Sequence, residues 1–523
     1  MRSAHSVSDV RAAEHALMAL VGDGVLMQRA AAGLASACAR LLGRRYGCRV
    51  VVLAGTGDNG GDALYAGARL AARGAAVTAI AAGPRLHEAG AAALVRSGGR
   101  ILPRAEHAMS QDPPDPDQAG QGMALAAAEL ARAGLIIDGI LGIGGRGGLR
   151  EPAATLAGHV AAAAHAGAAV VAVDLPSGVD ADTGVVSGTV IRADVTVTFG
   201  ALKPGLLIDP GASYAGAVDL IDIGLLPHLA GPAAAAAHQV ADVAALLPRP
   251  GAESDKYRRG VLGVLAGSDR YTGAAVLCVG GAIRGGAGMV RLVSASAAAD
   301  VVRQHWPEAV ITVTDPADPA AAIEQAGRVQ AWAAGPGLGT GEDAAALLAA
   351  VLGTSVPVLV DADGLTVLAK HRELLQRPAG APTLITPHAG ELARLLNAEP
   401  ADIEARRLDS ARRAAAELGV TVLLKGSTTV VAAPDRAEPA LVNPTGTGWL
   451  ATAGSGDVLS GLAGALLAQG VRPASSAAAI AAYLHGLAGR LAARDAPIGA
   501  ADVIAALPDA FRVVTGADRP GSG

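Results

Sequence analysis

The sequence predicts two domains of the α/β class, each with a largely parallel sheet that is covered by helices. The chain has 523 residues, whereas a single domain usually has about 100–200. In both halves short β-branched runs alternate with alanine-rich helical stretches, a pattern typical of parallel sheets with helices on both faces. Residues 228–250 are rich in alanine and proline, and we interpret them as a linker between domains 1–227 and 251–516.

Hydrophobic periodicity predicts the elements of each half. The first half is expected to open with a helix capped by Ser8 and Asp9, followed by helices over residues 26–42 and 63–72. Its strands are expected at residues 50–53, 135–137, 169–173, 195–199 and 218–223. In the second half we expect strands at 261–266, 289–293, 329–333, 356–360, 383–386, 420–424 and 429–432, and closing helices at 458–468 and 477–493.

Composition excludes several classes of function. Aromatic residues make up 2% of the chain, and 42 basic residues face 47 acidic ones without a dense basic run, which argues against a nucleic-acid partner. The three cysteines lack C-x-x-C spacing, so neither a disulfide framework nor a zinc site is expected. Charged residues near the N-terminus argue against a signal peptide, and the apolar stretch 160–175 is too short and polar to span a membrane. We therefore expect a cytoplasmic protein.

A glycine-rich motif follows the first predicted strand. Residues 55–62 read Gly-Thr-Gly-Asp-Asn-Gly-Gly-Asp and lead into a predicted helix. Glycines let the backbone turn tightly and approach a ligand, and free amides at a helix N-terminus attract anions. On its own the motif leaves a capped βα turn and a ligand site equally open.

Two further strand ends carry an aspartate. Asp138 begins a stretch with five glycines in ten residues, and Asp174 begins the turn Asp-Leu-Pro-Ser-Gly. An isolated aspartate at such a place usually caps a helix or stabilises a loop. Because ligands bind outside the carboxyl ends of parallel strands, three such ends together favour a common pocket.

These three elements, in this order, resemble the NAD(P)H-hydrate epimerase domain, with its patterns G-x-G-N-N-G-G-D, V-D-A-x-x-G-x-G and D-x-P-S-G. The resemblance implies a Rossmann-like doubly wound fold and a potassium ion held by Asn59, Asp138 and Ser177. It implies that the hydrated cofactor is bound by Asp58, Asn59, Gly60, Gly61, Asp62, Gly142, Ile143, Gly144, Gly145, Arg146, Gly147, Gly148 and Asp174. Asp174 suits the reaction, because epimerisation needs a group that removes and returns a proton. Asp58 and Ala63 depart from the family pattern, which has Asn and Gly there.

The most specific motif of the second half is Asn443-Pro444-Thr445-Gly446, which continues to residues 453–457, Ala-Gly-Ser-Gly-Asp, just before an apolar helix. A glycine-rich loop at a helix N-terminus binds anions through backbone amides. Asp457 stands where a general base would face a hydroxyl near bound phosphate; the alternative is an ordinary N-cap. Further ligand-type residues follow other predicted strands, in residues 335–339, 361–364, 386–391 and 425–429.

This set resembles the ADP-dependent NAD(P)H-hydrate dehydratase domain, a member of the ribokinase-like fold, from about residue 256 to residue 486. The resemblance implies that the ADP or AMP moiety is bound by Lys425, Gly426, Ser427, Thr428, Thr429 and Gly456. It implies that the hydrate is contacted by Ala274, Gly337, His388 and Asp457. Fusion of the two domains in one chain is itself characteristic of a repair enzyme for hydrated nicotinamide cofactors.

The implied reactions repair NADHX and NADPHX. One domain interconverts the (R) and (S) hydrates. In the other, Asp457 deprotonates the hydrate hydroxyl, which attacks the β-phosphate of ADP, and elimination then gives NAD(P)H with release of AMP and phosphate. Magnesium is expected with the nucleotide, and the chain is expected to form a homo-oligomer.

Two alternatives remain at this point. The second domain could be a ribokinase-like kinase for a sugar or vitamin that uses the same Gly454–Asp457 loop. The first domain could be a non-catalytic binding or oligomerisation module. Phosphorylation of such a small molecule would favour the kinase. Loss of (R)-hydrate conversion in Asp174→Asn, with (S)-hydrate conversion retained, would count against the binding module.

Overall fold

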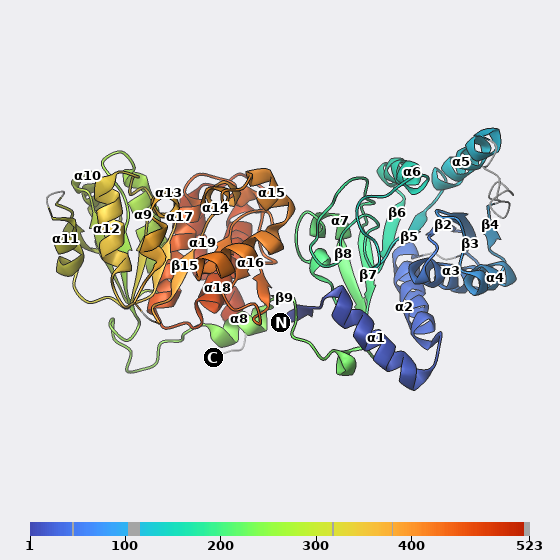
Figure 1. Ribbon diagram of the computed structural model, residues 1–523, viewed down its shortest axis with the longest axis horizontal. Coiled ribbons are helices and arrows are strands. Elements are labelled where there is room, and N and C mark those ends of the chain that lie inside the picture. Colours follow the sequence, from blue (N-terminus) through green and yellow to red (C-terminus); the bar gives the residue numbers. More distant parts are fainter. Residues whose placement is uncertain (44–45, 103–115, 316–317, 379, 517–523) are drawn as a thin grey trace. The chain divides into compact units, whose positions relative to one another are not determined.

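The computed structural model describes residues 1–43, 46–102, 116–315, 318–378 and 380–516. It divides into two compact units, Ser3–Ala234 and the pair of segments Met1–Arg2 and Ala235–Gly523. Both units have an α/β fold with large parallel sheets (Figure 1). The predicted fold class is therefore confirmed.

The N-terminal unit contains a seven-stranded parallel sheet in the order β4-β3-β2-β5-β6-β7-β8. Its strands are β2 (Arg49–Ala54), β3 (Ala76–Ala81), β4 (Arg100–Ile101), β5 (Leu135–Gly139), β6 (Ala169–Val173), β7 (Val195–Phe199) and β8 (Ala217–Ile221). Its helices are α1 (Val7–Val21), α2 (Val25–Leu42), α3 (Asp58–Ala71), α4 (Glu88–Arg96), α5 (Pro116–Leu130), α6 (Ala153–His165) and α7 (Ala212–Ala215), with 3-10 turns at Pro204–Leu206 and Leu226–His228.

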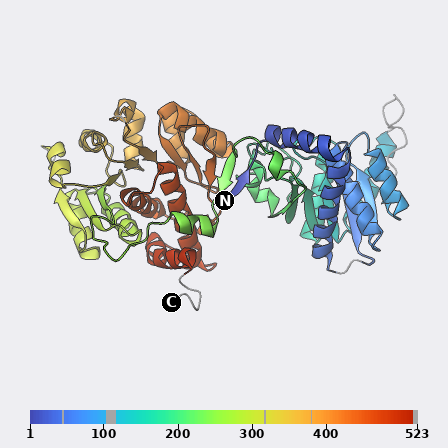
Figure 2. The same ribbon diagram turned by 90° about the horizontal axis from the view of Figure 1, so that it is seen from below.

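Helices cover both faces of this sheet because successive residues of a strand point to opposite sides. Val50 and Val52 of β2 pack in one core with α2 and α3, whereas Val51 and Leu53 pack in a second core with α5 and α6. The helices on the two sides can be followed in Figures 1 and 2. The run of apolar residues that predicted a buried strand therefore reflects burial on both faces.

The C-terminal unit contains an eleven-stranded sheet in the order β1-β9-β18-β17-β16-β15-β14-β13-β10-β11-β12. Its strands are β1 (Arg2–Ala4), β9 (Ala235–Ala237), β10 (Val261–Leu265), β11 (Met289–Ser294), β12 (Val310–Val313), β13 (Ala331–Ala334), β14 (Val358–Val360), β15 (Thr383–Ile385), β16 (Thr421–Leu424), β17 (Val430–Ala432) and β18 (Ala440–Val442). In the order of the sheet, the strands β16, β15, β14, β13, β10, β11 and β12 are parallel to one another, whereas β17 is antiparallel to both of its neighbours.

The helices of this unit are α8 (Val240–Leu246), α9 (Thr272–Arg284), α10 (Ser296–His305), α11 (Pro319–Gln325), α12 (Glu342–Leu352), α13 (Asp363–Lys370), α14 (Ala389–Leu396), α15 (Pro400–Ala405), α16 (Arg407–Leu418), α17 (Ser455–Ala468), α18 (Ala474–Ala493) and α19 (Ala500–Thr515). Two 3-10 turns lie at Arg372–Leu375 and Gly448–Leu450. Helices α9, α17, α18 and α19 contribute to one large core with the central strands.

Several elements differ from the sequence predictions. Helix α1 is capped by Ser6, whose side chain accepts a hydrogen bond from the N–H of Asp9, so Ser8 and Asp9 lie in the first turn instead. Strands β12 and β18 and helix α19 were not predicted. β12 has four residues, none of them buried, and β18 has only three residues, so neither gives a clear periodic signal.

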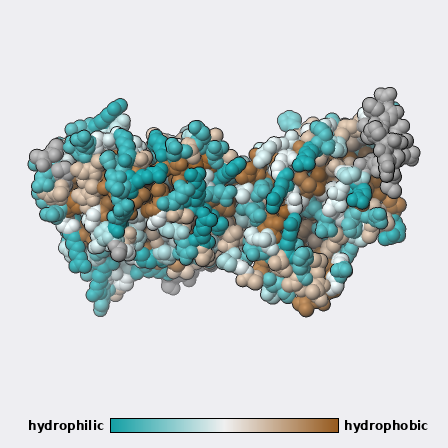
Figure 3. All heavy atoms as spheres, in the orientation of Figure 1, coloured by the Kyte–Doolittle hydropathy of each residue, from teal (hydrophilic) through white to brown (hydrophobic). Residues whose placement is uncertain are grey.

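Apolar residues reach the surface in small areas separated by hydrophilic ones (Figure 3). Within the described ranges, no single helix is long and apolar enough to cross a membrane. Only the pair α1 and α2 satisfies that length and composition together, and these two helices meet at a bend of 110°.

Candidate active sites of the two units

The first candidate site lies where the strand order of the N-terminal sheet reverses. β2 has β3 on one side and β5 on the other, and such a switch point leaves a crevice at the carboxyl ends of the strands. The N–H of Gly55 donates to the Gly139 carbonyl at 2.9 Å. A Cβ on Gly55 would lie 2.0 Å from the Ile140 carbonyl oxygen, so only glycine lets the loops after β2 and β5 lie side by side.

The motif residues 58–62 form the start of α3. This helix begins at Asp58, five residues before the predicted helix at 63–72, so the free amides of its first turn come from the motif itself. Asn59 Nδ2 and Asp62 Oδ1 are buried without a hydrogen-bond partner among the described residues. Buried polar atoms are nearly always paired in native proteins, so these two atoms are the ones a bound ligand would satisfy.

Asp138 and Ser177 form a buried pair. Ser177 Oγ donates to Asp138 Oδ1 at 2.6 Å, and the Ser177 N–H donates to Oδ2 at 2.9 Å. Burial raises the pKa of Asp138 to about 6, opposed by the Ser177 hydrogen bonds. The third residue predicted for the potassium ion, Asn59, is close by, because a Cβ on Gly142 would lie 2.9 Å from Asn59 Oδ1.

Asp174 ends β6 in a left-handed backbone conformation, with φ of 67°, which is uncommon for a residue other than glycine. Its Oδ1 accepts hydrogen bonds from Lys203 Nζ at 2.5 Å and from Thr198 Oγ1 at 3.0 Å. Sequence reasoning missed both partners. One signal was present: Lys203 is one of only four lysines among the 42 basic residues.

Further carboxylates gather around Asp174. Burial raises the pKa of Glu14 on α1, and Asp174 and Asp58 raise it further, while Lys203 opposes them. Burial also raises the pKa of Asp62 well above its usual value, with added repulsion from Asp174 and Asp58. Glu14 was not among the predicted site residues, since α1 carries no motif.

The predicted loop from Gly142 to Gly148 lies against the first helix. A Cβ on Gly144 would lie 3.2 Å from Nη2 of Arg11, which is one turn before Glu14 on α1. The structure thus brings the three predicted segments together and adds α1 as a further wall of the site.

The second candidate site is a pocket of about 810 Å³ in the C-terminal unit, a size typical of small-molecule sites. Its lining includes the predicted residues Lys425, Gly426, Ser427, Thr429, Gly456 and His388. Thr428 is buried behind them. Ala274, Gly337 and Asp457 do not line this pocket. Ala274 and Gly337 lie against each other, since a Cβ on Gly337 would be 2.7 Å from the Ala274 methyl carbon, and Asp457 directly follows the lining residue Gly456.

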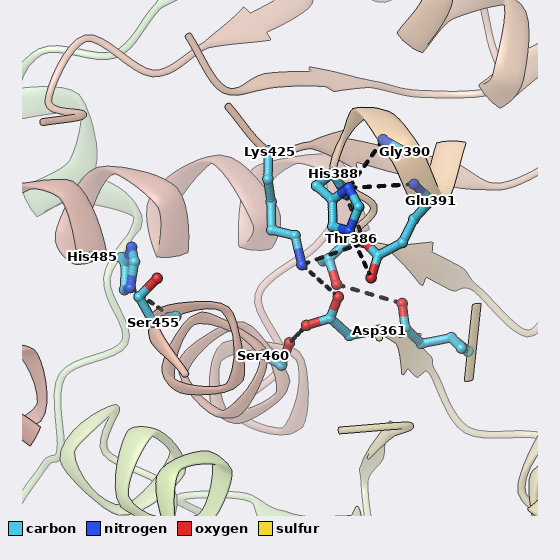
Figure 4. Close-up of polar contacts among 10 residues, drawn as sticks. Asp361, Thr386, His388, Gly390, Glu391, Lys425, Ser455, Ser460 and His485 are labelled. Carbon is cyan, nitrogen blue, oxygen red and sulfur yellow. Dashed lines mark hydrogen bonds and ion pairs between the residues drawn. The ribbon is translucent and has the colours of Figure 1, made fainter. Parts of the chain in front are cut away.

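Lys425 is the centre of a charged network beside this pocket (Figure 4). Its Nζ lies 2.7 Å from Asp361 Oδ1 and 3.9 Å from Glu391 Oε2. Ser460 Oγ donates to the other oxygen of Asp361 at 2.5 Å. Although burial lowers the pKa of Lys425, Asp361 and Glu391 raise it above its usual value, so the lysine carries a positive charge.

Asp457 lies in the first turn of α17, which Gly454 precedes in a left-handed conformation with φ of 84°. Burial, together with repulsion from Asp361, raises the pKa of Asp457 to about 7, although the positive charge of Lys425 acts in the opposite direction. A pKa near the working pH is what a general base requires.

His388 is the N-cap of α14. Its Nδ1 accepts hydrogen bonds from the N–H groups of Gly390 and Glu391, and Glu391 Oε2 accepts one from the His388 N–H. His388 thus stabilises the start of the helix, and its ring also lines the pocket (Figure 4).

Two pocket residues, Arg407 and His485, were not among the predicted site residues, although His485 lies in the last motif of the predicted domain. Arg407 is buried, and its Nη1 donates to the carbonyls of Lys425 at 3.1 Å and Thr428 at 3.4 Å. His485 Nε2 donates to the Ser455 carbonyl at 2.9 Å, and burial lowers its pKa to about 4. Arg407 supports the loop after β16, and His485 supports the start of α17.

The fold and the two sites define a two-domain α/β enzyme. One unit has a ligand crevice at a switch point, and the other has a nucleotide-sized pocket beside an aspartate at a helix start. Two family models match the chain: YjeF-related protein N-terminus over residues 23–205 and NAD(P)H-hydrate dehydratase over residues 262–508. The chain belongs to the family of bifunctional NAD(P)H-hydrate repair enzymes.

Relatives of the whole chain support this membership. The bifunctional NAD(P)H-hydrate repair enzyme Nnr of Mycobacterium leprae is 46% identical over 501 residues, which cover 95% of each chain. The enzyme of the same name from Mycobacterium tuberculosis is 47% identical over 92% of each chain. A solved structure of ADP/ATP-dependent NAD(P)H-hydrate dehydratase from Bacillus subtilis, co-crystallised with ATP and Mg²⁺, is 30% identical and covers 53% of this chain and 97% of that one, with a TM-score of 0.47.

This family membership decides between the alternatives left by the sequence. A sugar or vitamin kinase with a non-catalytic first domain would not have relatives of this family along its whole length. The predicted class, an enzyme with an NAD(P)H-hydrate epimerase domain and a dehydratase domain, is confirmed.

Proposed function

We propose that Asp174 is the acid–base residue of the epimerase half. It lies at the crevice at the switch point of the sheet. The start of α3 also contributes two buried polar atoms without a hydrogen-bond partner among the described residues, Asn59 Nδ2 and Asp62 Oδ1. Among the described carboxylates of this crevice, Asp174 is the one that forms an ion pair with a lysine. The hydrated cofactor would lie across the start of α3 and the loop of residues 142–148. Asp174 would remove a proton from the hydrate and return one.

A potassium ion would be held by Asn59, Asp138 and Ser177. The three residues supply amide, carboxylate and hydroxyl oxygens, which are the ligands that hard cations prefer. Support for the ion comes from the buried Asp138, whose raised pKa of about 6 reflects a burial of charge that its hydrogen bonds offset only in part. A cation would compensate that charge and fix the loop after β5 in place.

In the dehydratase half, Asp457 would be the general base and the pocket would bind ADP. The observation that carries this proposal is the position of Asp457, whose pKa is raised to about 7, directly after Gly456, which lines a pocket of about 810 Å³ together with Lys425. Asp457 would take the hydroxyl proton of the (S) hydrate as that oxygen attacks the β-phosphate of ADP. Backbone amides of residues 425–429 and of Gly456 would hold the phosphates.

Magnesium would accompany the nucleotide, since Mg²⁺ is usually bound through substrate phosphates and one or two carboxylates. The acidic residues beside the pocket are Asp361 and Glu391, whose carboxylates flank Lys425, and Glu404, which is part of the lining. Self-association of the chain and a cytoplasmic location remain predictions from the sequence.

The test uses the full chain with purified (R)- and (S)-NADHX, Mg²⁺ and K⁺. Recovery of the reduced-nicotinamide absorbance is followed with ADP, with ATP and with neither. Recovery from both epimers that requires nucleotide is expected. Recovery from the (S) form alone would contradict an active epimerase, and no recovery with either nucleotide would contradict both assignments.

A further inference from the structure

Lys203 is a buried cation that the proposed mechanism does not yet use. It is 1% exposed. Its Nζ contacts three oxygens: Asp174 Oδ1 at 2.5 Å, Thr198 Oγ1 at 3.0 Å and the Phe199 carbonyl at 3.2 Å. A lysine ammonium has three N–H donors, so each donor has one acceptor. The lysine is therefore held in one position.

The contacts on Asp174 are asymmetric. Lys203 and Thr198 both donate to Oδ1, whereas Oδ2 receives no hydrogen bond from the residues that the structure describes. Oδ2 is not one of the buried side-chain atoms without a hydrogen-bond partner, so this unpaired oxygen is not fully buried. The Asp174 side chain as a whole is 10% exposed. One oxygen is thus anchored inside the unit while the other stays accessible to a ligand.

The choice of lysine at this position is itself informative. Only four of the chain's 42 basic residues are lysines, so arginine is the usual cation of this protein. An ammonium is a compact point charge with rotatable donors, whereas a guanidinium is a planar fork. The cluster of one carboxylate oxygen, one hydroxyl and one carbonyl around a single nitrogen suits an ammonium.

The charges that face Asp174 come from three other elements. Glu14 lies on α1, Asp62 lies on α3, and Lys203 follows β7. Removing the lysine would leave the buried Asp174 near the carboxylates of Glu14 and Asp62 without its ion-pair partner. A buried charge without its partner is strongly unfavourable, so the carboxylate would no longer be held in place.

We propose that Lys203, with Thr198, is a positioning residue of the epimerase: the two residues fix Oδ1 of Asp174, so that Oδ2 faces the hydrate and exchanges the proton with it. This inference rests on the proposed role of Asp174. The hydrated carbon carries a hydroxyl group and is bonded to the ring nitrogen. Asp174 takes the hydroxyl proton, a carbonyl forms, the carbon–nitrogen bond breaks with its electron pair moving to nitrogen, and the proton passes to that nitrogen. Closure on the opposite face reverses each transfer and gives the other epimer.

The test measures interconversion of purified (R)- and (S)-NADHX by chromatography, without nucleotide, as a function of pH. Lys203→Met is expected to lower the rate near neutral pH by ~100-fold or more and to change the shape of the pH–rate profile, because the cation bonded to Oδ1 is lost. Thr198→Val, which keeps the cation, is expected to lower the rate less and to leave the profile nearly unchanged. Lys370→Met, at an exposed lysine of α13, is the matched control and should not change the rate.

A double variant separates positioning from a structural role. If Lys203 acts through Asp174, then Asp174→Asn with Lys203→Met should be as slow as Asp174→Asn alone. Nucleotide-dependent dehydration of (S)-NADHX by the same preparations, with denaturant unfolding, reports folding of each variant. A Lys203→Met rate and pH profile equal to wild type, with Asp174→Asn inactive, would overturn the inference and leave the proposed function standing. Full activity of Asp174→Asn would overturn the proposed function itself.

Discussion

At the residue scale, the aspartate proposed for proton transfer has different neighbours in the two units. Asp457 lies near other carboxylates, and burial with repulsion from Asp361 raises its pKa to about 7. Asp174 is paired directly with Lys203 at 2.5 Å.

The raised pKa of Asp457 predicts the pH dependence of dehydration. A general base must be ionised, so kcat/KM for (S)-NADHX at a fixed concentration of MgADP should rise as the pH increases through about 7. Asp457→Asn should lower kcat by about 10²–10⁴-fold and remove that limb. Steady-state rates of absorbance recovery check both. An Asn variant with an unchanged rate would remove Asp457 from the role of base.

Asp138 makes a prediction about stability. Its pKa is raised from 3.8 to about 6 in the folded chain, so the folded state binds more protons than the unfolded state between these values. The contribution of Asp138 to stability is therefore present below pH about 4 and is lost as the pH rises to about 6, a change of about 3 kcal/mol.

Potassium should offset that loss, because a cation bound to the ionised carboxylate stabilises the folded state. Denaturant unfolding of the full chain above pH about 6 should show a more stable N-terminal unit in KCl than in tetramethylammonium chloride at equal ionic strength. Asp138→Asn is the matched control, and its stability should respond less to pH. An equal response to both salts in the wild-type chain would speak against the ion site.

At the scale of elements, the crevice of the N-terminal unit depends on a backbone contact between the ends of β2 and β5. A Cβ on Gly55 would lie 2.0 Å from the Ile140 carbonyl oxygen, whereas a Cβ on Gly57 would meet nothing within 4 Å. The two glycines are two residues apart in the same loop, so they provide a direct comparison.

Gly55→Ala should destabilise the N-terminal unit by about 1–3 kcal/mol, because the two loops must separate to admit the methyl group. It should also abolish epimerisation, since the loops that carry Asn59 and Asp138 would shift. Gly57→Ala should change stability by less than about 1 kcal/mol. Chemical denaturation and (R)/(S) interconversion measure both variants, and equal effects of the two substitutions would contradict the loop contact.

The elements also show which strands and site residues could be predicted from the sequence and which could not. The buried strands were found because apolar runs such as residues 50–53 pack against cores on both faces. Edge strands such as β12, which has no buried residue, gave no such pattern. Motif residues were found where glycine or proline marks a loop. Lys203, Glu14 and Arg407 were missed because they reach their sites from elements without a motif, and their partners are set by tertiary packing.

At the scale of the whole molecule, each unit has its own sheet, its own core and its own candidate site. Among the described residues, the buried residues of the N-terminal cores end at Leu225, with Leu229 packed against them, and those of the large C-terminal core begin at Ala236. The product of the first reaction, the (S) hydrate, is the substrate of the second. A unit that folds around its own core can carry out its reaction when the other unit is inactive.

This independence predicts complementation between variants of the full chain. Asp174→Asn alone should recover NADH from the (S) hydrate and leave the (R) hydrate behind. Asp457→Asn alone should interconvert the hydrates without recovering any NADH. An equimolar mixture of the two variants should recover NADH from both epimers when MgADP is supplied, because the (S) hydrate released by one chain can diffuse to the other. The measurement is the final absorbance from purified (R)-NADHX. A mixture that recovers no more than Asp174→Asn alone would mean that the two active sites must belong to the same chain.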